Sequence, residues 1–355
     1  MSANSGARAY ELLRQRAKAV AADVQALAIS YAIERFMARL MAADDRGAVT
    51  VKGGQSLGIL FGNQMRPTKD LDINVDASSD AEEWIARTIR RACQIDLGDG
   101  LSIEPDGLRL EHREHQGEGG LRVSVPARVH SCRTDFAIDV GVGNEITFEP
   151  KTMTVAGVLG GHRTAPPALQ TRIYPHENTL AEKIAAKIED GVASIRHKDF
   201  FDVWLSVEIL RRAGDLRLLS ADDGEMTSEE RSRAAAVRTG LADGTLLTLP
   251  CVEASGECLD RLGLALARTA AHRGTALPSD LPDWLMHEFG EDRNHSAQWA
   301  NWCRNQKGRL RFSPPGTGKD DNRGEALATL LRHVGPELAE IAARAAPEAV
   351  PGMNP

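Results

Sequence analysis

The chain has 355 residues, a length that suggests about two domains or one large domain with an appendage. Hydrophobic residues make up 42% and charged residues 26%, so there is ample material for a core. A wholly disordered chain is therefore excluded. Lys and Arg number 43 and Asp and Glu number 50, so the net charge of −7 excludes a generally basic nucleic-acid coat protein, although not a local basic patch.

Several features predict a globular protein of the cytoplasm with no membrane partner. No apolar run approaches the ~18 residues of a membrane span, and the N-terminus lacks the apolar middle of a signal peptide. The five cysteines are odd in number, widely spaced and without a Cys-x-x-Cys pair. They favour reduced thiols over a disulfide framework or a zinc site.

The first half of the chain predicts helices among short strands, which is typical of an α+β layer. Apolar residues at helical spacing predict helices, and polar–apolar alternation predicts strands. The expected helices are 8–43, 55–61 and 79–95, and the expected strands are 49–51, 70–75 and several short ones within 101–140.

The second half predicts a mainly helical structure from Thr179 onward. Residues 219–248 are polar and short of large apolar side chains, so we interpret them as a partly helical surface insertion. The expected organisation is N-terminal helices at 1–45, a core at 46–160, a helical C-terminal domain at 161–345 that contains the insertion, and a disordered tail at 346–355.

Two aspartates lie two residues apart on the strand 70–75. Asp70 and Asp72 would point to the same face, ~6.5–7 Å apart along the backbone. Carboxylates so placed suit divalent ions such as Mg²⁺, which prefer fixed oxygen ligands and substrate phosphates. The alternative is the solvated face of an edge strand.

A glycine pair precedes them, between a strand and a short helix. Gly53 and Gly54 would bring bare backbone N–H groups and a helix N-terminus close to an anion. The alternative is an ordinary turn that needs a positive φ. Together with the aspartate pair, these glycines describe a phosphate cradle next to a metal cradle.

A third carboxylate comes from the apolar strand near residue 138. Asp139 would be costly to bury there unless it were paired or metal-bound. Asp135 has the same parity and is the competing choice. A partly exposed strand acid is the remaining alternative.

Thr179 begins a Thr-x-x-Glu pattern that is typical of a capping box. Lys183 would then lie in the first helical turn, against the helix dipole, which suggests that it serves an anion. Lys187 would lie one turn further on the same face. The alternative is two solvated lysines.

The segment 196–204 has two interpretations. Asp199 could be a helix N-cap, with Phe201 and Trp204 in the core. Alternatively, Arg196 and Lys198 bind phosphates, and Asp199 orients a basic side chain.

Two further motifs are weaker. His112 and His115 have a His-x-x-His spacing without any other ligand motif. The segment 301–312 carries four positive charges, no acid and interleaved aromatic residues, which suits contact with a nucleic-acid backbone. A solvated loop is the alternative.

Taken in order, these segments resemble the AbiEii/AbiGii toxin family of nucleotidyltransferases, which belongs to the DNA polymerase β-like superfamily and includes MenT-like type IV toxins. The resemblance spans about residues 25–305. It is carried by 31–36 (YAIERF), 51–54 (VKGG), 66–72 (RPTKDLD), 138–141 (IDVG), 174–175 with 179–183 (YP, TLAEK) and 196–202 (RHKDFFD).

The resemblance implies a polymerase β-like core with a small mixed sheet, followed by a mainly helical C-terminal domain. It implies metal binding by Asp70, Asp72 and Asp139, and catalytic roles for these three with Lys183 and Asp199. Asp202 is the alternative to Asp199. The implied nucleotide-binding residues are Gly53, Gly54, Ser56, Arg66, Lys183, Arg196 and Lys198. Ser56 is included because the superfamily usually has Gly-Ser at the turn, where this chain has a second glycine.

The resemblance also implies a Mg²⁺-dependent transfer, with Mn²⁺ as an alternative ion, of nucleotides from an NTP to an acceptor. The expected acceptor is the 3′ end of tRNA, and the expected result is inhibited translation and growth in a toxin–antitoxin or phage-defence pair. A cognate antitoxin from a neighbouring gene is the expected partner. The alternatives are a nucleotidyltransferase acting on a protein hydroxyl or a small molecule, and a catalytically silent nucleotide-binding module.

Overall fold

A computed structural model of the protein describes residues 3–20, 22–61, 68–115, 118–155, 157–160, 162–191, 196–220, 223–306 and 312–346. The chain divides into two compact units. The first unit comprises Met1–Asn144 and Pro150–Tyr174, and the second comprises Glu145–Glu149 and Pro175–Pro355.

The boundaries of these two units differ from the domain boundaries predicted from the sequence. The N-terminal helices belong to the same unit as the sheet, and the main boundary lies after Tyr174 instead of near residue 160. The reason is that the last strand of the first unit, Leu169–Ile173, pairs back onto the first strand. Apart from residue 346, the expected tail lies outside the described residues.

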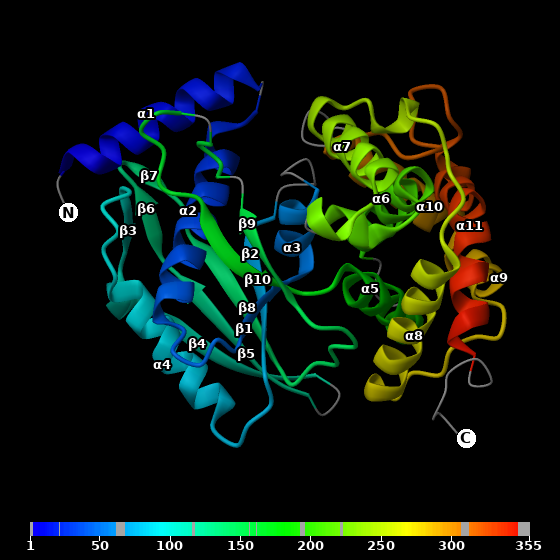
Figure 1. Ribbon diagram of the computed structural model, residues 1–355, viewed down its shortest axis with the longest axis horizontal. Helices are drawn as coiled ribbons and strands as arrows, with labels where there is room; N and C mark the ends of the chain where they lie inside the picture. The colour runs from blue at the N-terminus through cyan, green and yellow to red at the C-terminus, as the bar shows by residue number, and fades with distance from the viewer. Residues whose placement is uncertain are drawn as a thin grey trace. The chain divides into compact units, whose positions relative to one another are not determined.

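The first unit is an α+β layer (Figure 1). Its helices are α1 (Ala3–Ala19), α2 (Val24–Ala43), α3 (Gly53–Leu60) and α4 (Ala81–Gln94), with a short 3-10 turn, η1 (Pro105–Gly107). Its strands are β1 (Val49–Lys52), β2 (Asp70–Val75), β3 (Leu101–Ile103), β4 (Arg109–His115), β5 (Glu118–Val125), β6 (Ala127–Val129), β7 (Cys132–Arg133), β8 (Phe136–Val142), β9 (Lys151–Val155) and β10 (Leu169–Ile173).

The main sheet is mixed and has the strand order β4-β5-β8-β2-β1-β10-β9. The pairs β2·β8 and β1·β10 are parallel, and the other neighbours are antiparallel. Strands β3, β6 and β7 form a second small sheet. The predicted α+β fold class with a mixed sheet is confirmed.

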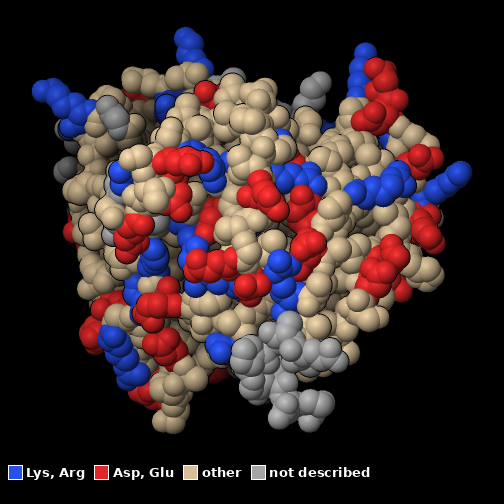
Figure 2. Space-filling model, turned by 45° about the vertical axis from the view of Figure 1, so that its right-hand side comes forward, with Lys and Arg blue, Asp and Glu red and all other residues tan. Residues whose placement is uncertain are grey.

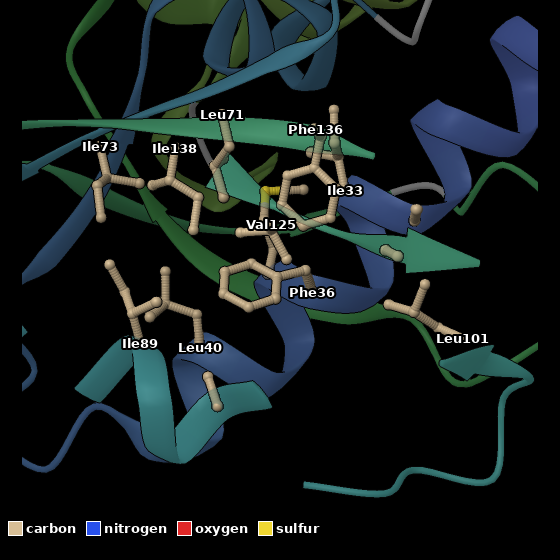
Figure 3. Packing of buried hydrophobic residues seen from close by; sticks show 14 of the residues in the cluster. Ile33, Phe36, Leu40, Leu71, Ile73, Ile89, Leu101, Val125, Phe136 and Ile138 are labelled. Atoms are coloured by element: carbon tan, nitrogen blue, oxygen red, sulfur yellow. The ribbon is translucent and has the colours of Figure 1, made fainter. Parts of the chain in front are cut away.

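One face of the main sheet is apolar and packs against helices. Figure 3 shows Phe36 and Leu40 of α2 and Ile89 of α4 beneath the sheet residues, which include Ile138 and Phe136 of β8. The rings of Phe36 and Phe136 are 5.3 Å apart. Because each strand alternates, the opposite sheet face is left to the polar side chains.

The predicted helix over 8–43 is in fact two helices. Asp23 caps α2 by accepting a hydrogen bond from the backbone N–H of Ala26. Such a cap favours a new helix start over continuation of α1. The sequence pattern lacks Pro and Gly here, so periodicity alone could not show the break.

A buried ion cluster fixes α2 to the segment that follows α4. Asp99 accepts bonds from Arg39 at 2.7 and 2.8 Å and from Arg35 at 2.9 Å. The side chains of Asp99 and Arg39 are 2% and 1% exposed. Burial raises the pKa of Asp99, but the two arginines outweigh it and hold this pKa below the ordinary value.

The second unit is helical, as predicted (Figure 1). Its helices are α5 (His176–Asp190), α6 (His197–Ala213), α7 (Ser228–Asp243), α8 (Gly256–Arg273), α9 (Leu281–Leu285), α10 (Arg293–Asn305) and α11 (Ala326–Ala345), with short turns η3 (Leu216–Leu219), η4 (Asp223–Glu225), η5 (Leu246–Thr248), η6 (Met286–Gly290) and η7 (Arg323–Glu325). The polar segment 219–248 contains α7, which begins with a capping box of Thr227 and Glu230. Phe201, Trp204 and Trp299 are fully buried in this unit.

Candidate active site

The polar face of the main sheet gathers charged residues from neighbouring strands. On β2, Leu71 and Ile73 are fully buried, whereas Asp70 and Asp72 are partly exposed. Strand β2 lies between β8 and β1, so the alternative of an edge strand is wrong. The aspartate pair lies on a central strand and shares one face with its neighbours' polar residues.

The strand register places five charged residues side by side. Glu111 is opposite Arg122, Arg122 is opposite Asp139, Asp139 is opposite Asp72, and Asp72 is opposite Lys52. We call these five residues the charge row. It crosses β4, β5, β8, β2 and β1, and paired residues in neighbouring strands share a face at a spacing of about 4.8 Å.

Arg122 joins two of the carboxylates. Its Nη1 donates to Asp139 Oδ2 at 2.5 Å, and its Nη2 donates to Asp70 Oδ1 at 3.2 Å. Burial lowers the pKa of Arg122, but the bonds to these acids outweigh it and raise this pKa above its ordinary value. Arg113 adds a longer contact, with Nη1 at 3.9 Å from Asp139 Oδ1. The sheet thus brings Asp70, Asp72 and Asp139 together with their own counter-ion.

The glycine turn lies against Asp72. Gly53 has φ +63° and is the first residue of α3. A Cβ added to it would lie 2.1 Å from Asp72 Oδ2. A glycine is therefore required here both for the backbone conformation and for the carboxylate. The first N–H groups of α3, which lack partners within the helix, begin beside the aspartate pair.

Ser56 does not support the expected nucleotide contact. Its side chain is fully buried, and its hydroxyl donates to the Gly53 carbonyl at 2.9 Å. The helix geometry causes this, because a serine three residues after a carbonyl can bond back to it. Arg66 lies outside the described residues.

Asp135 is excluded as the competing third acid. It precedes β8, and its carboxylate accepts from the backbone N–H of Ala127 and from the Arg133 guanidinium. Asp139, by contrast, lies in the charge row opposite Asp72. Parity alone could not separate the two aspartates, because the strand begins only at Phe136.

The second unit holds another charged group. Lys183 Nζ lies 3.0 Å from Asp199 Oδ1 and 2.7 Å from Asp202 Oδ2. Asp202 is fully buried, and the Asp199 side chain is 5% exposed. Burial raises the pKa of Asp199, but Lys183 outweighs it and holds this pKa below the ordinary value. Both alternatives for the last acidic residue thus contact the same lysine.

The predicted capping box at Thr179 is wrong. Helix α5 begins at His176, so Thr179 lies inside it and donates to the Pro175 carbonyl, and Lys183 lies well beyond the first turn. Glu177 is bonded to Arg261, which anchors the earlier start. The argument from the helix dipole therefore does not apply to Lys183.

Asp199 is not an N-cap either, because α6 begins at His197 and its cap residue is Arg196. The expected core positions Phe201 and Trp204 are confirmed as buried. Arg196 is exposed and lies 3.6 Å from Asp190, and Lys198 is exposed.

Lys187 is not a solvated lysine. It is 2% exposed, and its Nζ lies 4.9 Å from the ring centre of Phe200 and 5.9 Å from that of Phe289. Burial lowers the pKa of Lys187 to about 8, although Asp199 opposes this shift. Its charge is stabilised in part by the aromatic rings.

The carboxylates of the first unit offer oxygen ligands of the kind that Mg²⁺ prefers. Two like charges directly opposite each other, Asp72 and Asp139, also need a cation between or beside them. In the described ranges no three His, Cys, Asp or Glu residues are close enough to hold a metal ion as they stand. The donor set fits a divalent cation, while Arg122 neutralises two of its members in this structure.

The structure describes only parts of the two weaker motifs. His112 lies 3.1 Å from Glu82 of α4, and the side chain of His115 is outside the described part. Residues 307–311 of the basic segment are also outside it, whereas Trp302 stacks on Trp299 at 5.6 Å. A cavity of about 560 Å³ in the first unit is lined by residues of α1, α2, 97–99 and 159–170, and by none of the site residues predicted from the sequence.

The family model of the nucleotidyl transferase AbiEii toxin, from a type IV toxin–antitoxin system, matches residues 35–315. The chain belongs to this family. The match begins in α2 and ends beyond α10, so it includes the charge row and the Lys183 group. This AbiEii chain is therefore a nucleotidyltransferase of the toxin type, and its type IV system implies a cognate antitoxin. The predicted family is confirmed.

Two crystal structures from Helicobacter pylori are similar to the AbiEii chain. JHP933 is 13% identical with a TM-score of 0.30, and the match covers 68% of this chain and 92% of that one. A putative nucleotidyltransferase is 12% identical with a TM-score of 0.32, covering 88% and 93%. No curated protein matches the sequence. At these TM-scores, the family model is the finding that identifies the chain.

Sequence reasoning missed Arg122 in this AbiEii chain. The segment Leu121–Val125 alternates apolar and polar residues, which predicts a strand with Arg122 and Ser124 on one face. The signal was present, but the pairing of β5 with β8 is a long-range contact that alternation cannot supply.

Among the described residues, no helix is long and apolar enough to cross a membrane.

Proposed function

We propose that this AbiEii toxin transfers nucleotides from an NTP to the 3′ end of tRNA in a Mg²⁺-dependent reaction. The family supports the nucleotidyltransferase activity. The observation that carries the proposed chemistry is the gathering of Asp70, Asp72 and Asp139 on one sheet face beside the Gly53 turn. Phosphoryl transfer depends mostly on such positioning and on electrostatic stabilisation.

Asp70, Asp72 and Asp139 would hold Mg²⁺, with Mn²⁺ as the alternative ion. A bound divalent cation would supply charge neutralisation on the phosphates and would orient them. The central position of β2 keeps the two carboxylates at a fixed spacing, because both strand neighbours constrain the backbone.

The chain's own groups would bind and orient the nucleotide. The first N–H groups of α3, from Gly53 and Gly54, would donate to a phosphate. Lys52, whose Nζ donates to Asn144 Oδ1 at 2.9 Å, adds positive charge at the same turn.

A second set of basic groups belongs to the Lys183 segment. We assign Lys183 to neutralising charge on the phosphates, with Asp199 and Asp202 fixing its ammonium. Arg196 and Lys198 are exposed and would contact phosphates as well. An ammonium held by two buried acids keeps its position without reorganisation, which is what electrostatic catalysis needs.

The tRNA acceptor is supported by the basic and aromatic composition of 301–312. Figure 2 shows acidic and basic side chains interspersed over the visible face. We therefore expect any contact with RNA on this face to involve a small group of basic residues and not the whole face. The proposal places the toxin in the cytoplasm, with an antitoxin encoded by a neighbouring gene, where the modified tRNA would inhibit translation and growth.

The test is a transfer assay with purified full-length protein, Mg²⁺, total tRNA and each labelled NTP in turn. Asp72→Asn should lower the rate at least about a hundredfold, because it removes one charge that acts on the transition state. Asp76→Asn is the matched control, since Asp76 is exposed just beyond the same strand, and its rate should be unchanged.

Label on tRNA from one NTP, lost in Asp72→Asn and kept in Asp76→Asn, would support the proposal and identify the donor. Label on a protein or a small molecule instead would overturn the tRNA acceptor and favour the alternative acceptor. A folded protein that binds Mg·NTP but labels nothing would favour the silent module.

A further inference from the structure

We propose that Arg122 is a built-in competitor for the divalent cation: its guanidinium occupies the carboxylates when no metal is bound and must release them when one binds. This inference rests on the proposed metal site. Arg122 donates to Asp139 at 2.5 Å and to Asp70 at 3.2 Å, which are two of the three acids assigned to the metal.

The strand pairing makes this contact a fixed property of the fold. Arg122 is directly opposite Asp139 in β5·β8, and Asp139 is directly opposite Asp72 in β8·β2. Without a cation, the neighbouring carboxylates would repel one another across a strand spacing. Arg122 offsets part of that repulsion through its bonds to Asp139 and Asp70, so it stabilises the sheet without a metal.

The same contact opposes metal binding. A cation that binds Asp139 and Asp70 requires oxygens that already accept charge-assisted bonds from Arg122. Its affinity is therefore reduced by the free energy needed to break these bonds. The Arg122 side chain is 26% exposed, so an arginine released from the acids can reach solvent without leaving a buried charge.

Two nearby arginines provide matched comparisons on the same sheet face. Arg113 lies 3.9 Å from Asp139 and its side chain is 56% exposed. Arg109 is exposed and is opposite Ser124, and no ion pair of the described residues involves it. The three arginines thus carry the same charge but differ in their contact with the acids: Arg122 is hydrogen-bonded, Arg113 lies at a longer distance, and Arg109 has no ion pair among the described residues.

The experiment measures Mn²⁺ binding to the full-length protein by calorimetry, without nucleotide or RNA. Arg122→Gln should bind Mn²⁺ about tenfold more tightly than the natural protein. Arg113→Gln should show less than about a threefold gain, because an exposed charge at longer range is screened. Arg109→Gln should match the natural protein. Without metal, Arg122→Gln should also melt at a lower temperature and gain more from added Mn²⁺.

Equal or weaker Mn²⁺ binding by an Arg122→Gln protein that still shows a cooperative melting transition would overturn the inference. Loss of structure in this variant would weaken binding, which is opposite to the expected gain, so misfolding cannot imitate it. If the natural protein and all variants bind no Mn²⁺, the metal site itself is refuted. If the natural protein and Arg122→Gln bind equally and transfer persists, only the role of Arg122 is refuted.

Discussion

At the scale of single residues, Gly53 meets two independent requirements. Its φ of +63° disfavours any side chain, and Asp72 fills the space that a Cβ would take. Gly47 has the same φ of +63°, but nothing lies within 4 Å of its missing Cβ. Comparing Gly47 with Gly53 therefore separates the effect of the positive φ, which both share, from the steric effect of Asp72, which only Gly53 experiences.

We therefore predict that Gly53→Ala is more damaging than Gly47→Ala. The latter should lower the free energy of unfolding by about 1 kcal/mol, the usual cost of a left-handed non-glycine residue. Gly53→Ala should lower it by at least about 2 kcal/mol more, since Asp72 must move, and it should abolish transfer. Urea unfolding measures the loss of stability, and the transfer assay measures the loss of activity. Equal losses in the two variants would show that Asp72 does not constrain Gly53.

Lys187 predicts a pH dependence of stability. Burial lowers its pKa in the folded protein to about 8, from an ordinary value of 10.5. Below pH 8 both folded and unfolded chains carry the proton, so the penalty of burying the charge is fully present. Between these two pKa values the unfolded chain binds more protons, so stability rises with pH.

Lys187→Met should therefore be more stable than the natural protein by about 1–2 kcal/mol at pH 7, and this difference should shrink towards pH 10. The rings of Phe200 and Phe289 limit the gain, because they stabilise the ammonium. Urea unfolding across this pH range tests the prediction. A difference that is constant with pH would contradict it. Lys198→Met, at an exposed position of α6, is the control.

At the scale of elements, two Arg–Asp pairs of the first unit differ sharply in burial. Asp99 joins Arg39 in the interior, whereas Arg46 and Asp80 have side chains that are 40% and 42% exposed. Asp99→Ala should lower the free energy of unfolding by about 3–5 kcal/mol, because it leaves Arg39 buried without its partner. Asp80→Ala should cost less than about 1 kcal/mol.

Chemical denaturation of the two variants checks this contrast. Similar losses in both would mean that the Asp99 cluster does not fix α2 in place. A second control is Asp99→Asn, which keeps hydrogen-bonding atoms but removes the charge. It should lie between Asp99→Ala and the natural protein.

The elements also show how far sequence patterns reach. The strand Asp70–Val75 was predicted with its bounds, because alternation and burial agree along it. The Thr-x-x-Glu pattern predicts too late a start for α5, because Glu177 and its partner Arg261 are far apart in the sequence. Likewise, the resemblance implies a ligand contact for the hydroxyl of Ser56, whereas this hydroxyl donates to the Gly53 carbonyl. Local rules located the elements, and tertiary contacts decided their ends.

At the scale of the whole molecule, the chain has two compact units that contain separate charged groups. Lys183→Met leaves Asp202 fully buried without this lysine, so we predict a loss of about 3–5 kcal/mol in the second unit. Hydrogen exchange should show lost protection in α5 and α6 and unchanged protection in α2 and β2. Parallel loss in all four elements would show that the two units unfold together.

The candidate site could be predicted in part at this scale. The aspartates, the glycines and Lys183 stand in short motifs that resemble a family pattern, so the sequence alone indicated them. Arg122 belongs to no such motif, and only the order of the strands reveals it beside Asp139. A side chain whose importance depends on strand order is not visible in one sequence.

The order of the strands in the sequence also determines at what point during synthesis the charge row can be completed. Ribosomes release the chain from its N-terminus, so Asp70 and Asp72 emerge long before Asp139, and β5 and β8 must follow before the row is complete. A nascent chain that ends before β8 has the aspartate pair, but it lacks the third carboxylate and the strand that joins β2 to β5. We therefore expect chains of this toxin that end before β8 to be unable to transfer nucleotides.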